Sequence, residues 1–268
     1  MFGDCVIVRG GGDIATGTIQ KLYRAGFKVL VLEAEKPTSI RRTVCFSEAV
    51  YEGRVAVENI TAVLVKNEEE IYEAWKNKEI PLMIDEKGSY IDIIKPVAVV
   101  DAILAKRNLG TNKNMAPITI ALGPGFCAGE DVDVVIETMR GHNLGRLIFQ
   151  GLALPNTGVP GEIGGRSKER VIYSPASGRI KNIVEIGTVV KEEDILALIE
   201  GVEVKASIDG VLRGLIRDNS YIKEGLKIAD IDPRLSELDN YNTISDKARS
   251  IGGGVLEAIL FLQNKGGK

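Results

Sequence analysis

The residues best suited to bind a ligand form a glycine-rich segment near the start of the chain. An apolar run from Cys5 to Val8 leads into Gly10-Gly11-Gly12-Asp13-Ile14, and apolar residues then recur at helical spacing up to Gly26. The pattern Gly10-x-Gly12-x-x-Ala15 therefore falls where a strand turns into a helix. Gly10 permits the tight turn, Gly12 lets a phosphate approach the backbone, and the helix N-terminus supplies partial positive charge. We expect the amides of Gly11 to Ile14 to bind a phosphate.

A carboxylate follows the second apolar run of this segment. Glu33 ends the run Val29 to Leu32, about 20 residues beyond the glycines, where such a side chain accepts hydrogen bonds from ribose hydroxyls. Its charge would repel a 2′-phosphate, which favours NAD or another adenosine-containing nucleotide over NADP. Asp13 argues against binding, because its charge suits a helix N-terminus but would repel a phosphate. The alternative is a sheet that keeps the turn without a ligand.

Two adjacent arginines extend this candidate site. Arg41 and Arg42 follow the second predicted strand, so we expect them near the same edge of the sheet. A pair of guanidinium groups there could clamp a phosphate of the ligand. The alternative is a solvated loop.

The catalytic residues stay unknown, and two side chains are weak candidates. Cys127 lies in a glycine-rich loop, where a thiol of lowered pKa could carry sulfur or selenium, although Glu130 and Asp131 would raise that pKa. His142 is the single histidine, so a general-base role at neutral pH would fall to it. The spacing of the cysteines, histidine and carboxylates matches no metal site, and we expect none.

The composition excludes several classes of partner. The chain has 268 residues, 44% of them hydrophobic, and a net charge of −3, so electrostatics favours neither nucleic acid nor an anionic membrane. The three cysteines lie far apart, which argues against a disulfide framework. The sequence shows no secretory signal pattern, and no apolar run reaches about 18 residues. We expect a cytoplasmic protein without a membrane partner; oligomer formation stays open.

Alternating strand and helix patterns predict the α/β fold class. We expect a doubly wound, Rossmann-like nucleotide-binding domain over residues 1–166, a small β sandwich over 167–234, and a helical tail over 235–268 that packs on the first domain. In the tail, Gly252-Gly-Gly254 is poor helix material, so we expect the helix to begin near Gly254.

An internal repeat underlies the predicted sandwich. Ser174 to Ile180 aligns with Ala206 to Leu212 at a constant shift of 32 residues, and the alignment continues without a gap. The two halves resemble the biotinyl and lipoyl carrier domains, which are barrel-sandwich hybrids. Glu203 aligns with the modified lysine of those carriers, so we expect no biotin or lipoate, although Lys205 lies nearby. A docking role for this domain is the simpler interpretation.

Several motifs, in order along the chain, resemble one family. The chain is similar to the accessory proteins of the selenium-dependent molybdenum hydroxylase system, the YqeB family, and its first half is distantly similar to xanthine dehydrogenase accessory proteins. The resemblance rests on Gly10 to Gly17, Ser39 to Val50, Leu122 to Phe126, Glu137 to Arg146, Asn156 to Gly161 and Ser245 to Ala258. It implies a maturation factor whose client is a molybdenum hydroxylase. On this resemblance, the phosphate that Arg41 and Arg42 could clamp would include that of a pterin cofactor such as the molybdenum cofactor.

Three functions follow from these observations. The first is an accessory factor that binds a nucleotide or pterin-type cofactor at the glycine-rich turn and supplies a molybdenum hydroxylase. The second is an NAD-dependent oxidoreductase, in which His142, the single histidine, would act as the acid or base beside the nicotinamide. The third is a nucleotide-binding assembly module without catalysis. Binding without turnover would separate the second function from the other two.

Overall fold

The computed structural model describes residues 4–266, which form two compact units. Unit 1 contains residues 4–37, 45–156 and 244–266, and unit 2 contains 38–44 and 157–243. The predicted boundaries at 166/167 and 234/235 therefore differ from those of the units. The outermost residues of the predicted first domain and tail, 1–3 and 267–268, lie outside the described part of the chain.

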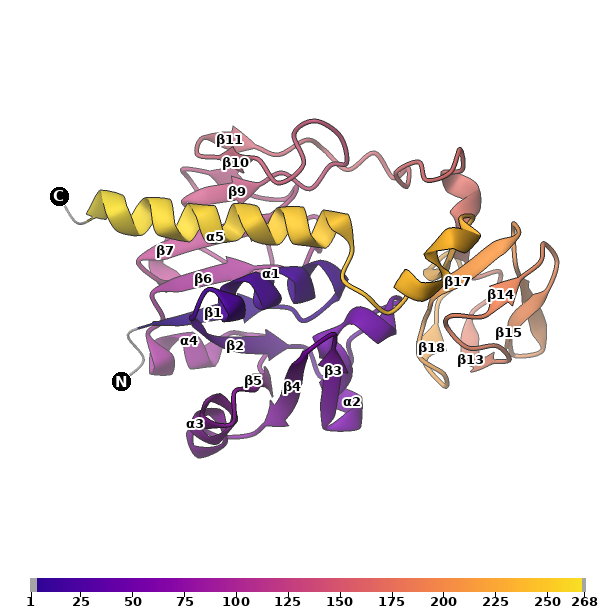
Figure 1. Ribbon diagram of the computed structural model, residues 1–268, viewed down its shortest axis with the longest axis horizontal. Helices are drawn as coiled ribbons and strands as arrows, with labels where there is room; N and C mark the ends of the chain where they lie inside the picture. Colours follow the sequence, from indigo (N-terminus) through magenta and orange to yellow (C-terminus); the bar gives the residue numbers. More distant parts are fainter. Residues whose placement is uncertain (1–3, 267–268) are drawn as a thin grey trace. The chain divides into compact units, whose positions relative to one another are not determined.

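Unit 1 is built on a nine-stranded sheet with the order β10-β9-β7-β6-β1-β2-β5-β4-β3 (Figure 1). Runs of valine, isoleucine and leucine are buried on both faces of its central strands, as expected for parallel strands covered by other elements. A two-stranded sheet, β11-β8, accompanies it. The strands of unit 1 are β1 (Cys5–Arg9), β2 (Lys28–Glu33), β3 (Arg54–Val57), β4 (Ile60–Val65), β5 (Ile80–Ile84), β6 (Ala98–Asp101), β7 (Ile118–Leu122), β8 (Cys127–Ala128), β9 (Val134–Ile136), β10 (Leu147–Ile148) and β11 (Gly151–Leu152).

Five α-helices belong to unit 1. The sequence signals that start and stop them are local: in α3, for example, the Asn67 side chain accepts a hydrogen bond from the Glu70 amide at 2.9 Å and so caps the first turn. The helices are α1 (Asp13–Arg24), α2 (Ala49–Glu52), α3 (Glu68–Lys76), α4 (Ser89–Ile94) and α5 (Asp246–Gly266). Two short 3₁₀ turns, η2 (Phe46–Glu48) and η3 (Lys113–Met115), also belong to unit 1, whereas a third, η1 (Arg42–Val44), belongs to unit 2.

The predicted Rossmann-like class is wrong for this unit. Seven neighbouring strands, from β9 to β4, are parallel, but β10 and β3 at the two edges pair antiparallel. A doubly wound fold also needs a helical crossover between successive parallel strands. No α-helix is described between β6 and β7, which are joined through the 3₁₀ turn η3, or between β7 and β9, which are joined through loops and the short strand β8. The sheet is therefore mixed, and only its β1–β5 side has the predicted alternation of strands and helices.

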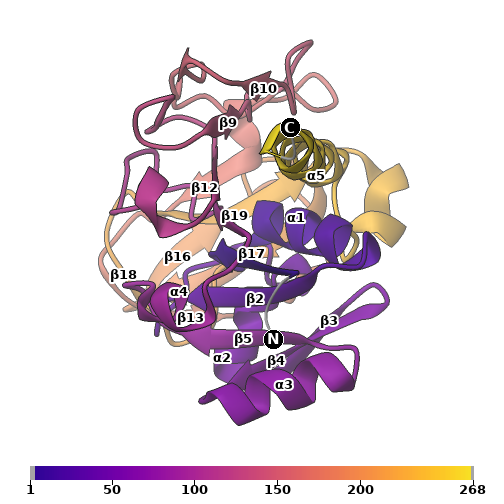
Figure 2. The same cartoon turned by 90° about the vertical axis from the view of Figure 1, so that its left-hand side faces the viewer.

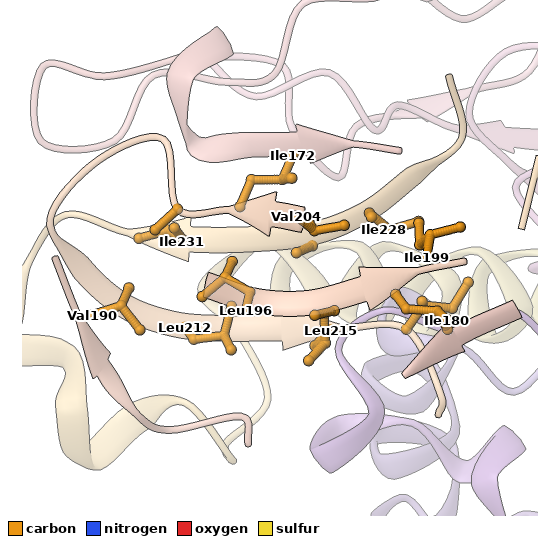
Figure 3. Packing of buried hydrophobic residues seen from close by; sticks show 14 of the residues in the cluster. Ile172, Ile180, Val190, Leu196, Ile199, Val204, Leu212, Leu215, Ile228 and Ile231 are labelled. Atoms are coloured by element: carbon orange, nitrogen blue, oxygen red, sulfur yellow. The ribbon is translucent and has the colours of Figure 1, made fainter. Parts of the chain in front are cut away.

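Unit 2 contains two four-stranded antiparallel sheets, ordered β12-β19-β17-β14 and β16-β15-β13-β18. Apolar side chains of both sheets form one buried core, in which Leu196, Leu212 and Leu215 are fully enclosed (Figure 3). The strands are β12 (Val171–Tyr173), β13 (Gly178–Asn182), β14 (Val189–Val190), β15 (Ile195–Ile199), β16 (Val202–Lys205), β17 (Gly210–Leu215), β18 (Tyr221–Ile222) and β19 (Lys227–Asp232). Two 3₁₀ turns, η4 (Lys168–Arg170) and η5 (Leu235–Asn240), flank them.

The 32-residue repeat is visible in the pairing of these strands. β13, β14 and β15 begin 32 residues before β17, β18 and β19, respectively. Gly178 pairs with Ile222 in one sheet, and Gly210 pairs with Val190 in the other. The two pairs are equivalent, because Gly210 is the repeat equivalent of Gly178 and Ile222 is that of Val190. The two halves therefore exchange their short second strands, β14 and β18, and each half completes the sheet of the other.

The predicted barrel-sandwich hybrid is nevertheless a wrong assignment. The strand pairing gives two separate antiparallel sheets, with a bulge between Leu212 and Gly214 in only one of the repeats. At the β15–β16 hairpin, Glu203 is exposed, and the Lys205 ammonium pairs with Glu193 at 3.3 Å and with Glu203 at 3.5 Å. These carboxylates raise the pKa of Lys205, which keeps its amine protonated and a poor nucleophile. That no biotin or lipoate is attached stays a prediction.

Helix α5 packs against α1, and glycines permit the close approach (Figures 1 and 2). A Cβ at Gly17 would lie 2.6 Å from the Ala248 carbonyl oxygen, and a Cβ at Gly252 would lie 2.6 Å from the Gly17 oxygen. At Gly254, a Cβ would collide with the carbonyl oxygen of Gly145. The expected start of the helix near Gly254 is wrong, because the helix begins at Asp246 and packing offsets the low helix propensity of the glycines.

We expect opposite effects from alanine at two adjacent positions of α5. Gly252→Ala should lower the free energy of unfolding by about 1–3 kcal/mol, because the new methyl group overpacks the backbone of α1. Gly253→Ala should raise it by up to about 1 kcal/mol, because a Cβ there has no atom within 4 Å and alanine favours the helix. Urea denaturation of both variants measures this, and equal effects would contradict the close helix contact.

Among residues 4–266, no helix is long and apolar enough to cross a membrane.

Candidate functional site

The glycine-rich turn connects β1 to α1 as the sequence predicts. Gly10 has a φ of +97°, and its amide donates to the Leu32 carbonyl oxygen at 2.8 Å. A Cβ at Gly10 would lie 2.9 Å from the Ala102 oxygen, so both the backbone angle and the space exclude a side chain. The turn itself therefore requires a glycine at this first position.

The next two glycines differ in what they require. Gly11 accepts a hydrogen bond from the Ser47 amide at 2.8 Å, and a Cβ there would lie 2.9 Å from that nitrogen. Gly12, in contrast, is the N-cap of α1 with φ −70° and ψ −175°, angles that other residues adopt. No side chain caps α1 at this residue, and the amides of a first helical turn have no partner within the helix. Gly12 and the residues after it thus present the N-terminus of a 12-residue helix.

Glu33 folds back onto the turn. One carboxylate oxygen accepts from the Gly11 amide at 2.7 Å, and the other accepts from the Ala34 amide at 2.7 Å. Burial raises the pKa of Glu33 against the opposing effect of these two hydrogen bonds, and the charge of Glu86 raises it further. The Gly11 amide, which the sequence assigned to a phosphate, is therefore bonded to a carboxylate. Each carboxylate oxygen has a second lone pair with which it can still accept from a ribose hydroxyl.

A buried polar cluster, which sequence reasoning missed, lies at the same edge of the sheet. Arg9, the last residue of β1, and Asp101, the last residue of β6, are 3% and 2% exposed, and their charged groups lie 3.9 Å apart. Thr111 joins them, since its hydroxyl accepts from Arg9 at 2.5 Å and donates to Asp101 at 2.6 Å. Arg9 also donates to the Glu86 carbonyl oxygen at 2.9 Å. The sequence feature that could have revealed this cluster is a charged residue, Arg9, at the end of an apolar strand. The cluster anchors the ends of β1 and β6 next to the glycine turn.

A second polar group gathers where α5 begins. Asp246 receives two hydrogen bonds from Arg140, at 2.7 and 3.0 Å. Glu137 is buried and accepts from the amides of Met139 at 2.7 Å and Leu154 at 2.8 Å. Lys247 is half-buried, and burial lowers its pKa, as does the charge of Arg140. The sequence motif that contains Lys247 was noted, but the lysine was not singled out.

The two predicted phosphate-clamping arginines lie in unit 2, whereas the glycine turn lies in unit 1. Arg41 is almost fully buried and donates to the carbonyl oxygen of Thr243 at 3.3 Å. Arg42 donates through Nε to the Leu215 oxygen at 2.8 Å. Both guanidinium groups therefore bind the backbone of unit 2, and alanine substitutions would disturb that unit as well as any clamp. Their role toward a phosphate stays a prediction.

The two candidate catalytic side chains are not brought together with a base or nucleophile. Cys127 begins the short strand β8 instead of a helix, and burial, Glu130 and Asp131 raise the pKa of its thiol. His142 is exposed in the connection between β9 and β10. Within residues 4–266, no group of three or more histidine, cysteine, aspartate or glutamate side chains is arranged to hold a metal ion. The glycine-rich turn at the start of α1 stays the candidate site, and binding of an anion there stays a prediction.

Comparison with known proteins gives one close sequence relative. The chain is 52% identical over 263 residues, or 98% of its length, to the protein named "Uncharacterized protein YqeB" of Escherichia coli strain K12. It covers 48% of that relative, so it spans about half the length of the protein it matches. No family model matches the chain.

Solved structures give only distant similarities. One is a succinylglutamate desuccinylase from a Silicibacter species, with a TM-score of 0.26, 14% identity, and coverage of 85% of this chain and 84% of the other. Another is an aspartoacylase family protein from Mesorhizobium loti, with a TM-score of 0.27, 12% identity, and 85% coverage of each chain. Similarity at this level carries no argument about the site. The sequence similarity to YqeB is the finding that bears on family.

Proposed function

We propose that unit 1 binds the phosphate of a nucleotide or pterin-type cofactor at the glycine-rich turn, and that the protein is a maturation factor for selenium-dependent molybdenum hydroxylases. The observation that carries the binding proposal is Gly12, because neither its φ nor its ψ needs a glycine. A residue without a side chain at the N-cap of α1 would let an anion approach the backbone amides of the first helical turn. The maturation role is supported by the motif resemblance and by the similarity to YqeB.

Binding without catalysis fits the rest of the site better than an oxidoreductase does. A nicotinamide-dependent reaction needs an acid or base positioned at the cofactor, whereas His142 is exposed in a loop. The raised pKa of Cys127 also makes it a poor thiolate nucleophile at neutral pH. We therefore propose that the site binds a cofactor without changing it, and that the protein then supplies this cofactor to a hydroxylase client.

Gly12→Val tests the binding proposal. The variant should fold, since the backbone angles at this position suit a side chain. Binding of adenosine diphosphate, measured by isothermal titration calorimetry, should be lost, because the isopropyl group fills the space of the phosphate. Gly253→Ala provides a control glycine substitution, because Gly253 has a helical backbone and a Cβ there meets no atom within 4 Å. Unchanged affinity in Gly12→Val would reject the glycine turn as the binding site.

A further inference from the structure

A group of exposed apolar side chains gathers on one face of unit 1, where the connection between β10 and β11 meets the C-terminal half of α5 (Figures 1 and 2). The rings of Phe149 and Phe261 join these two segments, with their centroids 5.2 Å apart. Leu152 and Leu154 follow Phe149 along the chain, and Leu260 precedes Phe261. All five side chains are exposed. Together they are named the Phe149 face.

In the segment 152–154, the large apolar side chains lie on the outer side. Ala153 is buried in a cluster with Phe126 and Val135, whereas Leu152 and Leu154 on either side of it are exposed. Such alternation is typical of an extended segment, in which the outer side is normally polar. Leu152 is 69% exposed although it lies in β11, part of a sheet of two short strands. A ribbon of two strands needs other elements packed against it, and the outer side of this one is apolar.

The outer side of α5 also becomes apolar toward the C-terminal end of the helix. Buried residues such as Ile251 and Ile259 face the core at helical spacing. On the other side, Glu257 is exposed, but Leu260 and Phe261, one turn further on, are exposed apolar residues. A surface helix normally carries polar residues opposite its core stripe, and a helix that is apolar all round is covered by other elements. This part of α5 therefore has the composition of a helix that is covered on its outer side as well.

The relative YqeB shows that more protein accompanies this fold. The match takes up 98% of this chain but 48% of YqeB, so more than half of YqeB lies outside it. A part of that length is large enough to form a domain of its own. Domains of one polypeptide meet across an interface of about 600–1,500 Å². At 52% identity, the matched part of YqeB has the fold of this chain, so one face of that fold is available to the rest of YqeB.

We propose that the Phe149 face binds a protein domain equivalent to the part of YqeB outside the match. The same face serves whether that domain continues the same polypeptide or belongs to another one. Phe149 and Phe261 join the two segments of the face, and aromatic side chains supply much of the binding energy of protein interfaces. An exposed group of large apolar side chains is typical of such interfaces. The proposal is independent of any ligand at the glycine-rich turn.

The test is hydroxyl-radical footprinting, which oxidises exposed leucine, isoleucine and phenylalanine side chains. Two proteins are compared: the full chain, and a chimaera in which the full chain replaces the matched part of Escherichia coli YqeB. Phe149, Leu152 and Phe261 should lose most of their reactivity in the chimaera, because the further domain covers them. Ile93, which is exposed on α4, should react equally in both proteins. Equal reactivity of the Phe149 face in the two proteins would overturn the proposal.

Leu152→Glu and Ile93→Glu are matched variants of the chimaera. The side chains that they replace are 69% and 48% exposed, so both variants should fold, which thermal unfolding checks. Leu152→Glu should return Phe149 and Phe261 to their reactivity in the chain alone, because burial of a charge in an apolar interface is costly. Ile93→Glu should leave both rings protected. Equal protection of the rings in the two variants would reject the Phe149 face as the binding surface.

A second copy of the chain is the other occupant that the experiment distinguishes. Sedimentation velocity is measured on the full chain with and without Leu152→Glu. The substitution should leave the oligomeric state of the chain unchanged, because the proposed partner is a different domain. A dimer that Leu152→Glu dissociates would assign the Phe149 face to contact between copies and would overturn the proposal.

Discussion

Asp101→Ala is expected to lower the free energy of unfolding of unit 1 by about 3–5 kcal/mol. The substitution leaves the Arg9 guanidinium 3% exposed, without the carboxylate that lies 3.9 Å from it. A guanidinium cannot lose its proton in a protein, so it cannot escape the cost of a buried unpaired charge. Thr111 also loses the acceptor of its hydroxyl proton. Urea denaturation followed by circular dichroism measures the change.

Asp92→Ala is the matched control for that substitution. Asp92 is exposed on α4, so its loss should change the free energy of unfolding by no more than about 0.5 kcal/mol. If Asp101→Ala were as stable as Asp92→Ala, the Arg9–Asp101–Thr111 cluster would not anchor the strand ends as described. The same variant would also be expected to bind ligand more weakly, because Ala102 packs directly against Gly10.

Glu33→Gln is expected to abolish the preference for a nucleotide without a 2′-phosphate. In the unsubstituted protein the ionised carboxylate at the end of β2 repels a 2′-phosphate, so adenosine diphosphate should bind at least about 10-fold more tightly than its 2′-phosphorylated form. A neutral amide removes the repulsion and should bring the ratio of the two affinities close to one. Titration calorimetry with both nucleotides measures the ratio, and Glu35→Gln, an exposed neighbour, is the control.

The same preference should depend on pH in a defined direction. Burial raises the pKa of Glu33 above its ordinary value of 4.5. Above that raised pKa the carboxylate is charged and discriminates; as the pH falls through it, the carboxyl group becomes neutral and the preference disappears. Glu33→Gln should show only the titration of the nucleotide phosphates themselves. A preference that is the same in Glu33→Gln and the unsubstituted protein at every pH would show that Glu33 does not contact the ribose.

Local sequence patterns correctly predicted the glycine turn. β1 ends at Arg9, α1 begins at Asp13 and Glu33 ends β2, because apolar runs, glycines and helical spacing act within a few residues of one another. The internal repeat was also visible in the sequence, since each half has its own glycine turn and apolar alternation. Its pairing was not, because the exchange of β14 and β18 between the halves depends on contacts that no single half encodes.

Contacts between distant residues account for what the sequence did not reveal. The Glu33 carboxylate bonds to an amide 22 residues away, and Thr111 joins Arg9 across 102 residues. Three glycines in α5 look like a helix breaker until Gly17 and Gly145 are seen packed against two of them. Arg41 and Arg42 follow a strand of unit 1 in sequence, yet the backbone carbonyls that bind them belong to unit 2. The position of an arginine along the sequence does not show whether its guanidinium group binds backbone carbonyls or the phosphate of a ligand.

The most direct test of the proposed function is the state of a selenium-dependent molybdenum hydroxylase purified from cells that lack this protein. We predict that the hydroxylase polypeptide is present but inactive, with a reduced content of its cofactor or of its terminal chalcogen ligand, both measured on the purified enzyme. Supplying the unsubstituted protein should restore activity, whereas Gly12→Val should not. A fully active hydroxylase, with a complete cofactor, from cells lacking this protein would contradict the proposed role.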